Sequence, residues 1–293
     1  MNYRIIHKTE YKYHEKVSLC HNIARLTPRS TDKQFCKKTT VKIEPEPDVL
    51  NEYEDFFGNK VVYFAIQKPH EKLTVTVTSD IQKNSPGIIE MKLYGNTPWE
   101  EVLKQIKEPK PDHFDARQYA LESPMISPIP EISLYASQSF YPGRPIFEAT
   151  QDLMQRIFRD FKFVSGFTTI ATPLSTVIAE RKGVCQDFAH LAIACVRSVG
   201  LPARYISGYI ETIPPPGKEK LTGVDASHAW FSVFIPNVGW TDFDPTNNQL
   251  PGDQYITNGW GRDYSDITPL KGVILSSGDH ELSVSVDVRR VNY

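Results

Sequence analysis

The sequence predicts an α+β protein: an all-β N-terminal region of sandwich or barrel type, then a half in which helices precede antiparallel strands. Residues 1–95 contain segments rich in Val, Ile, Thr and Tyr, and closely spaced turn residues separate these segments. An apolar stripe with helical spacing covers residues 185–199. The strands predicted after this stripe do not alternate with helices, which argues against βαβ units.

The composition is that of a globular chain. Of the 293 residues, 40% are hydrophobic and 23% are charged, which allows a sizeable core in one large or two smaller domains. The net charge of −2, without a long basic run, predicts neither a nucleic-acid partner nor a membrane partner. No run approaches the ~18 apolar residues of a spanning helix. The first residues lack the apolar stretch of a signal peptide, so we expect a cytoplasmic protein.

Residues 1–95 are predicted to form an accessory β domain. Its predicted strands are 3–13, 39–44, 60–66 and 72–79. In the last segment, aliphatic residues alternate with threonines, as in a strand with one buried face. The region also contains three histidines spaced seven apart: His7, His14 and His21. That spacing suits neither one strand nor an i,i+4 metal pair, so we expect no metal site there.

Residues 96–145 differ from both flanking regions. Prolines punctuate this stretch and its charges are mixed, so we interpret it as a connector with short helices and without a core of its own. A helix is predicted from Ile146 to Phe161, and residues 146–293 are assigned to the second domain.

Two further helices open the informative part of this domain. Thr172 and Pro173 are a suitable N-cap and first helical residue for a helix that ends near Arg181. The next helix begins at Cys185, and its apolar stripe ends before Gly200. Cys185 therefore lies in the first turn, on the face that meets the core.

Strands are predicted after these helices, at 203–210, 228–235, 240–244 and 281–291. The loop 211–226 contains consecutive prolines followed by charged residues, so we expect it to be exposed.

The four cysteines are too few for a disulfide scaffold. Cys20 and Cys36 are the pair that an oxidising compartment would join, but the absence of a signal peptide favours reduced thiols. Cys195 lies on the apolar helix stripe and is predicted to be a plain core residue. Cys185 differs because a helix N-terminus lowers the pKa of a thiol, and an adjacent imidazolium lowers it further.

His228 is the best candidate for that imidazole, since it opens a predicted strand. Asp244, at the end of the next strand, is the candidate to orient it. A hairpin centred on Pro236 places the two side chains directly opposite one another. A centre between Asn237 and Val238 turns them to opposite faces, and the sequence does not choose between these registers. Asp242 competes with Asp244, because alternate strand residues share a face.

Four blocks in order closely resemble the bacterial transglutaminase-like family: Gly183-Val184-Cys185-Gln186-Asp187-Phe188-Ala189-His190, Leu201-Pro202-Ala203-Arg204-Tyr205, Ser227-His228-Ala229-Trp230 and Gly239-Trp240…Asp244-Pro245-Thr246. The segment Gly261-Arg262-Asp263-Tyr264, the closing strand and the N-terminal β region are similar to parts of the same family. The resemblance therefore covers essentially the whole chain.

This resemblance implies a papain-like fold and a catalytic triad of Cys185, His228 and Asp244. It implies that Cys185 attacks a carboxamide carbonyl while the imidazole of His228 moves the proton. The oxyanion would be held by the backbone N–H of Cys185 and one further donor. The sequence does not identify that donor, and Gln186 is only a neighbouring candidate.

The triad predicts a thioester acyl-enzyme but does not decide how it is resolved. Family resemblance favours water, giving a protease or amidase that acts on a peptide or protein, over an amine, giving a transglutaminase. A protein- or peptide-binding scaffold without catalysis is the alternative of another class. A zinc site from Cys185, Asp187 and His190 lacks a fourth ligand at standard spacing. No dinucleotide or phosphate fingerprint and no calcium loop is present, so no cofactor is expected. The sequence does not predict an oligomeric state.

Overall fold

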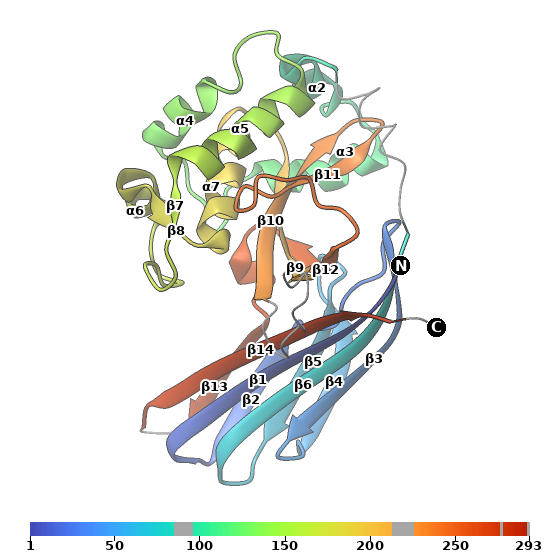
Figure 1. Ribbon diagram of the computed structural model, residues 1–293, viewed down its shortest axis with the longest axis vertical. Helices are drawn as coiled ribbons and strands as arrows, with labels where there is room; N and C mark the ends of the chain where they lie inside the picture. Colours follow the sequence, from blue (N-terminus) through green and yellow to red (C-terminus); the bar gives the residue numbers. More distant parts are fainter. Residues whose placement is uncertain (85–95, 213–225, 276–277, 292–293) are drawn as a thin grey trace, which may run out of the picture.

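The computed structural model describes residues 1–84, 96–212, 226–275 and 278–291. A β-sandwich occupies one end of the molecule, and a helix-covered sheet occupies the other (Figure 1). This arrangement agrees with the predicted α+β class. The exposed loop predicted at 211–226 lies largely outside the described residues.

The sandwich consists of two four-stranded antiparallel sheets. One has the order β14-β1-β6-β3, and its strands are β14 (His280–Arg290), β1 (Asn2–Val17), β6 (His70–Lys83) and β3 (Gln34–Glu44). The other has the order β13-β2-β5-β4, and its strands are β13 (Leu270–Leu275), β2 (Leu19–Ala24), β5 (Lys60–Ile66) and β4 (Val49–Glu54). The sequence analysis missed β2, β4 and β13.

The last two strands correct the prediction that the second domain extends from residue 146 to residue 293. Strand β14 pairs with β1, and β13 pairs with β2, so both close the N-terminal sandwich and do not belong to the second domain. Val286 and Val288 on β14 are buried together with Tyr3 and Ile5 on β1. The alternating apolar pattern of residues 281–291 correctly predicted a strand, but its partner, β1, lies at the opposite end of the chain.

The helical half has one core that includes residues of 96–145, so this stretch has no separate core, as predicted, but it belongs to the helical half and is not a connector between domains. Val102, Ile132 and Phe140 pack in the same cluster as Leu191 and Phe231. The helices are α2 (Trp99–Gln105), α3 (Pro111–Arg117), the 3₁₀ turn η1 (Gln118–Ala120), α4 (Pro130–Ser137), α5 (Ile146–Asp160), α6 (Leu174–Glu180), α7 (Cys185–Ser198) and the 3₁₀ turn η2 (Tyr264–Asp266).

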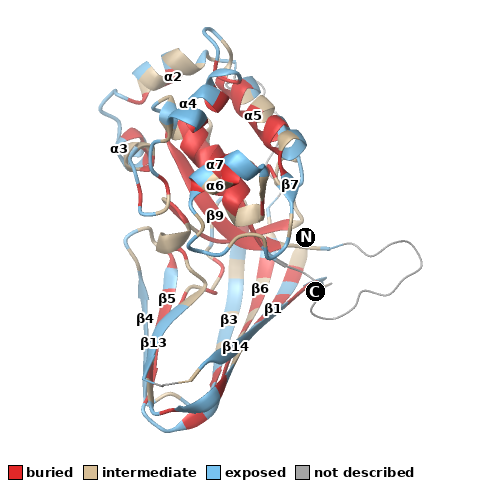
Figure 2. Ribbon diagram, turned by 90° about the vertical axis from the view of Figure 1, so that its left-hand side faces the viewer, coloured by how far each residue is buried: buried red, intermediate tan, exposed pale blue. Residues whose placement is uncertain are grey.

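Helix α7 packs against a four-stranded antiparallel sheet of order β11-β10-β9-β12. These strands are β11 (Gly239–Phe243), β10 (Ala226–Ile235), β9 (Ala203–Ile210) and β12 (Tyr255–Gly261), of which β12 was not predicted. Most of α7 is buried (Figure 2). Gly200, whose φ is +84°, follows the helix as predicted.

Helix α6 begins one residue later than predicted. Pro173 takes the N-cap position, and the Thr172 hydroxyl accepts a hydrogen bond from the Thr169 N–H instead of capping the helix. A short parallel pair of strands, β7 (Lys162–Phe163) and β8 (Lys182–Gly183), leads the chain into α7.

Side chains of the sandwich bind the outer edge of β12. The Gln34 amide donates to the Thr257 carbonyl at 2.6 Å and accepts from the Thr257 N–H at 2.9 Å. Asn59 makes the same two-way contact with Trp260, at 2.8 and 3.0 Å. Lys83 donates to the Tyr255 carbonyl at 2.7 Å. These contacts take the place of a neighbouring strand, so the two halves share the hydrogen bonding of one sheet.

Candidate active site

Cys185 is the first residue of α7, and the local chain explains why the helix begins there. The Asp187 carboxylate accepts hydrogen bonds from the Val184 N–H at 2.7 Å and from the Thr168 hydroxyl at 2.6 Å. The acid therefore satisfies an amide at the helix start, where the dipole also favours negative charge. A Cβ on Gly183 would lie 2.8 Å from the same carboxylate, so glycine is required before the turn.

The structure brings the three candidate side chains together. His228, on β10, is buried, and its Nε2 lies 2.8 Å from Oδ2 of Asp244. The Cys185 side chain lies near the same imidazole and contributes to raising its pKa. Cys185 itself is partly exposed, as a thiol that meets a substrate must be. This order of contacts, thiol to imidazole to carboxylate, is the one that activates a cysteine nucleophile.

Both hairpin registers considered from the sequence are wrong. Ile235 pairs with Gly239, and Phe231 pairs with Phe243, so the hairpin is centred on Asn237, whose φ is +66°. Relative to the Pro236-centred register, Asp244 moves by two positions and stays on the face of His228. The two side chains meet diagonally, just after β11 ends.

Asp244 is fully buried, and its carboxylate accepts five hydrogen bonds. Oδ1 accepts from the backbone N–H groups of Thr246 at 2.9 Å and Asn247 at 3.3 Å. Oδ2 accepts from the Asn247 amide at 2.7 Å and the Tyr255 hydroxyl at 2.6 Å, as well as from His228. The imidazole and these donors hold the pKa of the Asp244 carboxyl below its usual range although burial opposes ionisation. The sequence analysis missed Asn247 and Tyr255, since neither lies in a recognised block.

The remaining candidates have other partners. Asp242 lies 3.6 Å from the Lys33 ammonium and not at His228. Nε2 of His190 accepts from the Tyr264 N–H at 3.1 Å, and burial lowers the pKa of His190 to about 4, so its ring is neutral. Asp187 caps α7 and His190 binds the Tyr264 N–H, so these two side chains do not form a zinc site with Cys185. Among the described residues no group of three metal-ligating side chains occurs.

The other cysteines are free thiols. Cys195 is fully buried, as predicted for a core residue, and burial raises its pKa to about 12. Cys20 is buried on β2 and Cys36 lies on β3, so the two are in different sheets and are not joined.

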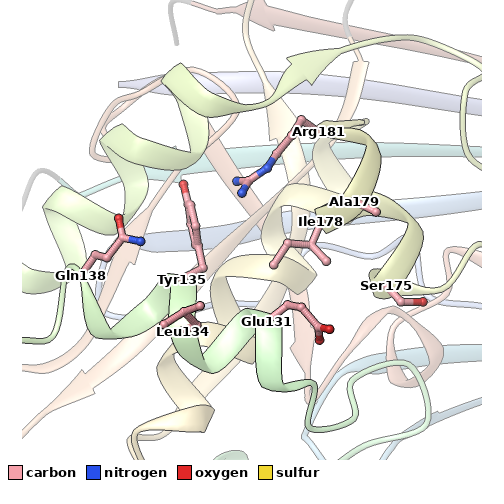
Figure 3. Close-up of a pocket in the computed structure, with 8 residues that line it drawn as sticks. All are labelled: Glu131, Leu134, Tyr135, Gln138, Ser175, Ile178, Ala179 and Arg181. Atoms are coloured by element: carbon pink, nitrogen blue, oxygen red, sulfur yellow. The ribbon is translucent and has the colours of Figure 1, made fainter.

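A cavity of about 380 Å³ lies elsewhere, between α4 and α6 (Figure 3). Leu134, Tyr135, Ile178 and Arg181 contribute to its lining. Its lining includes neither Cys185 nor any residue of β10, so it is separate from the candidate site.

The pKa of His228 gives a testable consequence of this geometry. Burial lowers it, but the hydrogen bonds and negative charges of Asp244 and Cys185 outweigh burial and raise it to about 9. Because the folded value exceeds the ordinary 6.5, the pair stabilises the fold fully below pH 6.5, and this stabilisation is lost as the pH rises through 9. We expect NMR titration of the imidazole to show this raised value, and a lower one in Cys185→Ala. A midpoint near 6.5 in both proteins would contradict the contact.

Two family models match the chain. The bacterial transglutaminase-like N-terminal region matches residues 3–82, and the transglutaminase-like superfamily matches residues 137–245, which include all three candidate residues. Protein Rv2569c of Mycobacterium tuberculosis, itself uncharacterized, is 41% identical over 300 residues, covering 98% of this chain and 92% of the relative. The chain belongs to the transglutaminase-like superfamily. The resemblance seen in the sequence blocks is thereby confirmed.

Two further similarities are to a solved structure and to part of a named enzyme. A Cytophaga hutchinsonii structure, provisionally assigned as a cysteine protease, has a TM-score of 0.75 at 20% identity and covers 100% of this chain and 92% of its own. This likeness supports the fold of a transglutaminase-like core behind a β-rich N-terminal region. A protein-glutamine gamma-glutamyltransferase of Pseudomonas aeruginosa is 33% identical over 72 residues, only 24% of this chain and 11% of that protein. Within the described residues, no helix is long and apolar enough to cross a membrane.

Proposed function

We propose that this transglutaminase-like protein is a cysteine hydrolase that cleaves peptide or protein amides through Cys185, His228 and Asp244. The observation that carries the proposal is the position of the Cys185 thiol beside the His228 imidazole, whose Nε2 is hydrogen-bonded to the buried Asp244 carboxylate. A pure binding scaffold has no use for a thiol placed at a helix N-terminus against an imidazole with a raised pKa.

The reaction follows from these groups. The Cys185 thiolate attacks the amide carbonyl carbon, and the negative charge passes to the carbonyl oxygen, which the Cys185 N–H binds. His228 gives its proton to the departing nitrogen, the C–N bond breaks, and a thioester remains. His228 then takes a proton from water, whose oxygen attacks the thioester; the C–S bond breaks, and a carboxylic acid leaves while the Cys185 thiolate and the His228 imidazolium are restored. Asp244 keeps the imidazole oriented and stabilises its charged form throughout. The second oxyanion donor, with Gln186 as a candidate, stays a prediction.

Transfer to an amine is the second candidate. The Pseudomonas aeruginosa relative bears the name of a glutamine acyltransferase, and an amine can attack the same thioester in place of water. Hydrolysis is preferred here because it requires no second substrate site. Incubating the protein with glutamine-containing and other peptides, with and without a primary amine, separates the two by product mass.

Alkylation of Cys185 tests the proposal directly. We expect iodoacetamide to label Cys185 at pH 6 faster than Cys36, because the His228 imidazolium stabilises the attacking sulfur at a helix N-terminus. Peptide mass spectrometry reads the labelled site, and Cys36, which is also partly exposed, serves as an internal reference. His228→Ala should remove the advantage of Cys185 at pH 6. Equal labelling of Cys185 and Cys36 in the unchanged protein would contradict the proposal of a hydrolase and favour the alternative of a binding scaffold.

A further inference from the structure

Tyr255 occupies a position between the candidate site and the N-terminal sandwich. It is the first residue of β12 and is almost fully buried. Its hydroxyl donates to Asp244 at 2.6 Å and accepts from the Gln249 amide at 2.6 Å. The tyrosine therefore extends the hydrogen-bonded chain beyond the three residues of the predicted triad.

The oxygen that Tyr255 contacts is the one that contacts His228. Oδ2 of Asp244 accepts from the imidazole at 2.8 Å, and Tyr255 and Asn247 donate to the same atom. A fully buried carboxylate has no water to stabilise its charge, so its ionised form depends on such donors. A directed donor also fixes the plane of the carboxylate, and with it the ring that must face Cys185.

The backbone at Tyr255 is in turn held from the other half of the molecule. Lys83, on β6 of the sandwich, donates to the Tyr255 carbonyl at 2.7 Å. Two residues further along β12, Gln34 binds both the N–H and the carbonyl of Thr257. Since β12 is the edge strand of its sheet, these side chains take the place of a neighbouring strand on that edge.

We propose that Tyr255 is a positioning residue for the Asp244–His228 pair, and that the N-terminal sandwich contributes to the site by fixing β12. This inference rests on the proposed function, and it assigns the accessory domain a part in the chemistry. The phenol does not touch the substrate. It keeps Asp244 ionised and aligned, and thereby keeps His228 able to activate the thiol.

Tyr255→Phe tests the positioning role, because it removes the hydroxyl and keeps the ring. The readout is the rate of Cys185 alkylation across the acid pH range. A donor to a carboxylate favours its charged form, so losing it lets Asp244 bind a proton at higher pH. We expect the acid limb of the profile to move up by about one pH unit. The matched control is Tyr209→Phe, a buried tyrosine on β9 whose hydroxyl contacts His7 at 3.1 Å, and its profile should not move.

The outcomes separate this inference from the proposed function. If the unchanged protein shows no rapid labelling at pH 6, the hydrolase fails and the positioning role fails with it. If it labels rapidly and Tyr255→Phe leaves the acid limb in place, or Tyr209→Phe moves it equally, only the positioning role is overturned. Gln34→Leu tests the contribution of the sandwich, with thermal unfolding as the check on folding. A folded Gln34→Leu protein should show a shift in the same direction, and an unshifted profile would refute the part assigned to the sandwich.

Discussion

Replacing Asp244 by asparagine is expected to lower kcat for an amide substrate about 10⁴-fold, the scale of the same change in a Ser-His-Asp triad. The Asp244 carboxylate only accepts hydrogen bonds. The donors are His228, Tyr255, Asn247 and the Thr246 N–H. An asparagine NH₂ must therefore face a donor in either orientation of the amide. The neutral side chain also ceases to stabilise the imidazolium. Initial rates with a fluorogenic derivative of a peptide that the product-mass experiment shows to be cleaved measure the effect.

The chain offers a matched control two residues earlier. Asp242→Asn changes the same type of residue on the same strand face, but Asp242 lies against Lys33 and not against His228. We expect Asp242→Asn to retain nearly full activity. Equal losses in the two variants would mean that the effect comes from the sheet and not from the orientation of His228.

The Gly208→Ala variant is expected to lose about 3 kcal/mol of unfolding free energy, at the upper end for overpacking of a core. A Cβ at this position would meet the Ile256 carbonyl oxygen and the Trp230 ring at distances that real Cβ atoms do not show. The first of these is backbone of the neighbouring strand, which cannot move without breaking the β9–β12 pairing. Urea unfolding followed by tryptophan fluorescence measures the change.

Gly252→Ala is the control for glycine itself, because a Cβ there meets nothing within 4 Å. Its unfolding free energy should change by less than about 1 kcal/mol. Gly208 also pairs directly with His228 across β9 and β10. We therefore expect rapid labelling of Cys185 in Gly208→Ala to disappear at urea concentrations at which the protein is still folded. Unchanged stability in Gly208→Ala would contradict the close packing of Trp230 over β9.

The parts of the fold that were predicted correctly are those with a strong local pattern. The apolar stripe, the glycine stop and the preceding turn predict α7 from Cys185, and β9 occupies the predicted residues, Ala203–Ile210. Strand β12 was not predicted, because its glycines and asparagine interrupt the alternation of apolar and polar residues that marks a strand. Its hydrogen bonding depends on Gln34 and Asn59, more than 190 residues away in the chain, which no local pattern contains.

The candidate site was predictable in its residue types but not in its geometry. The pairing of His228 with Asp244 depends on a hairpin turn in which Asn237 and Gly239 both have positive φ, and two other turn positions were equally compatible with the sequence. The two residues that complete the environment of Asp244 could not be found in this way. Tyr255 and Asn247 have types that occur at many surface positions, and only the folded chain places them at the carboxylate.

The closing of the sandwich by β13 and β14 has a consequence for how the chain is made. Strands β1 and β2 emerge from the ribosome first, yet each lacks a neighbour on one side until β14 and β13 follow. Translation of residues 84–269 separates them, which takes about 10–40 s at ~5–20 residues per second. During that interval two β edges are open to other nascent chains, so the first domain to be synthesised is the last to be completed.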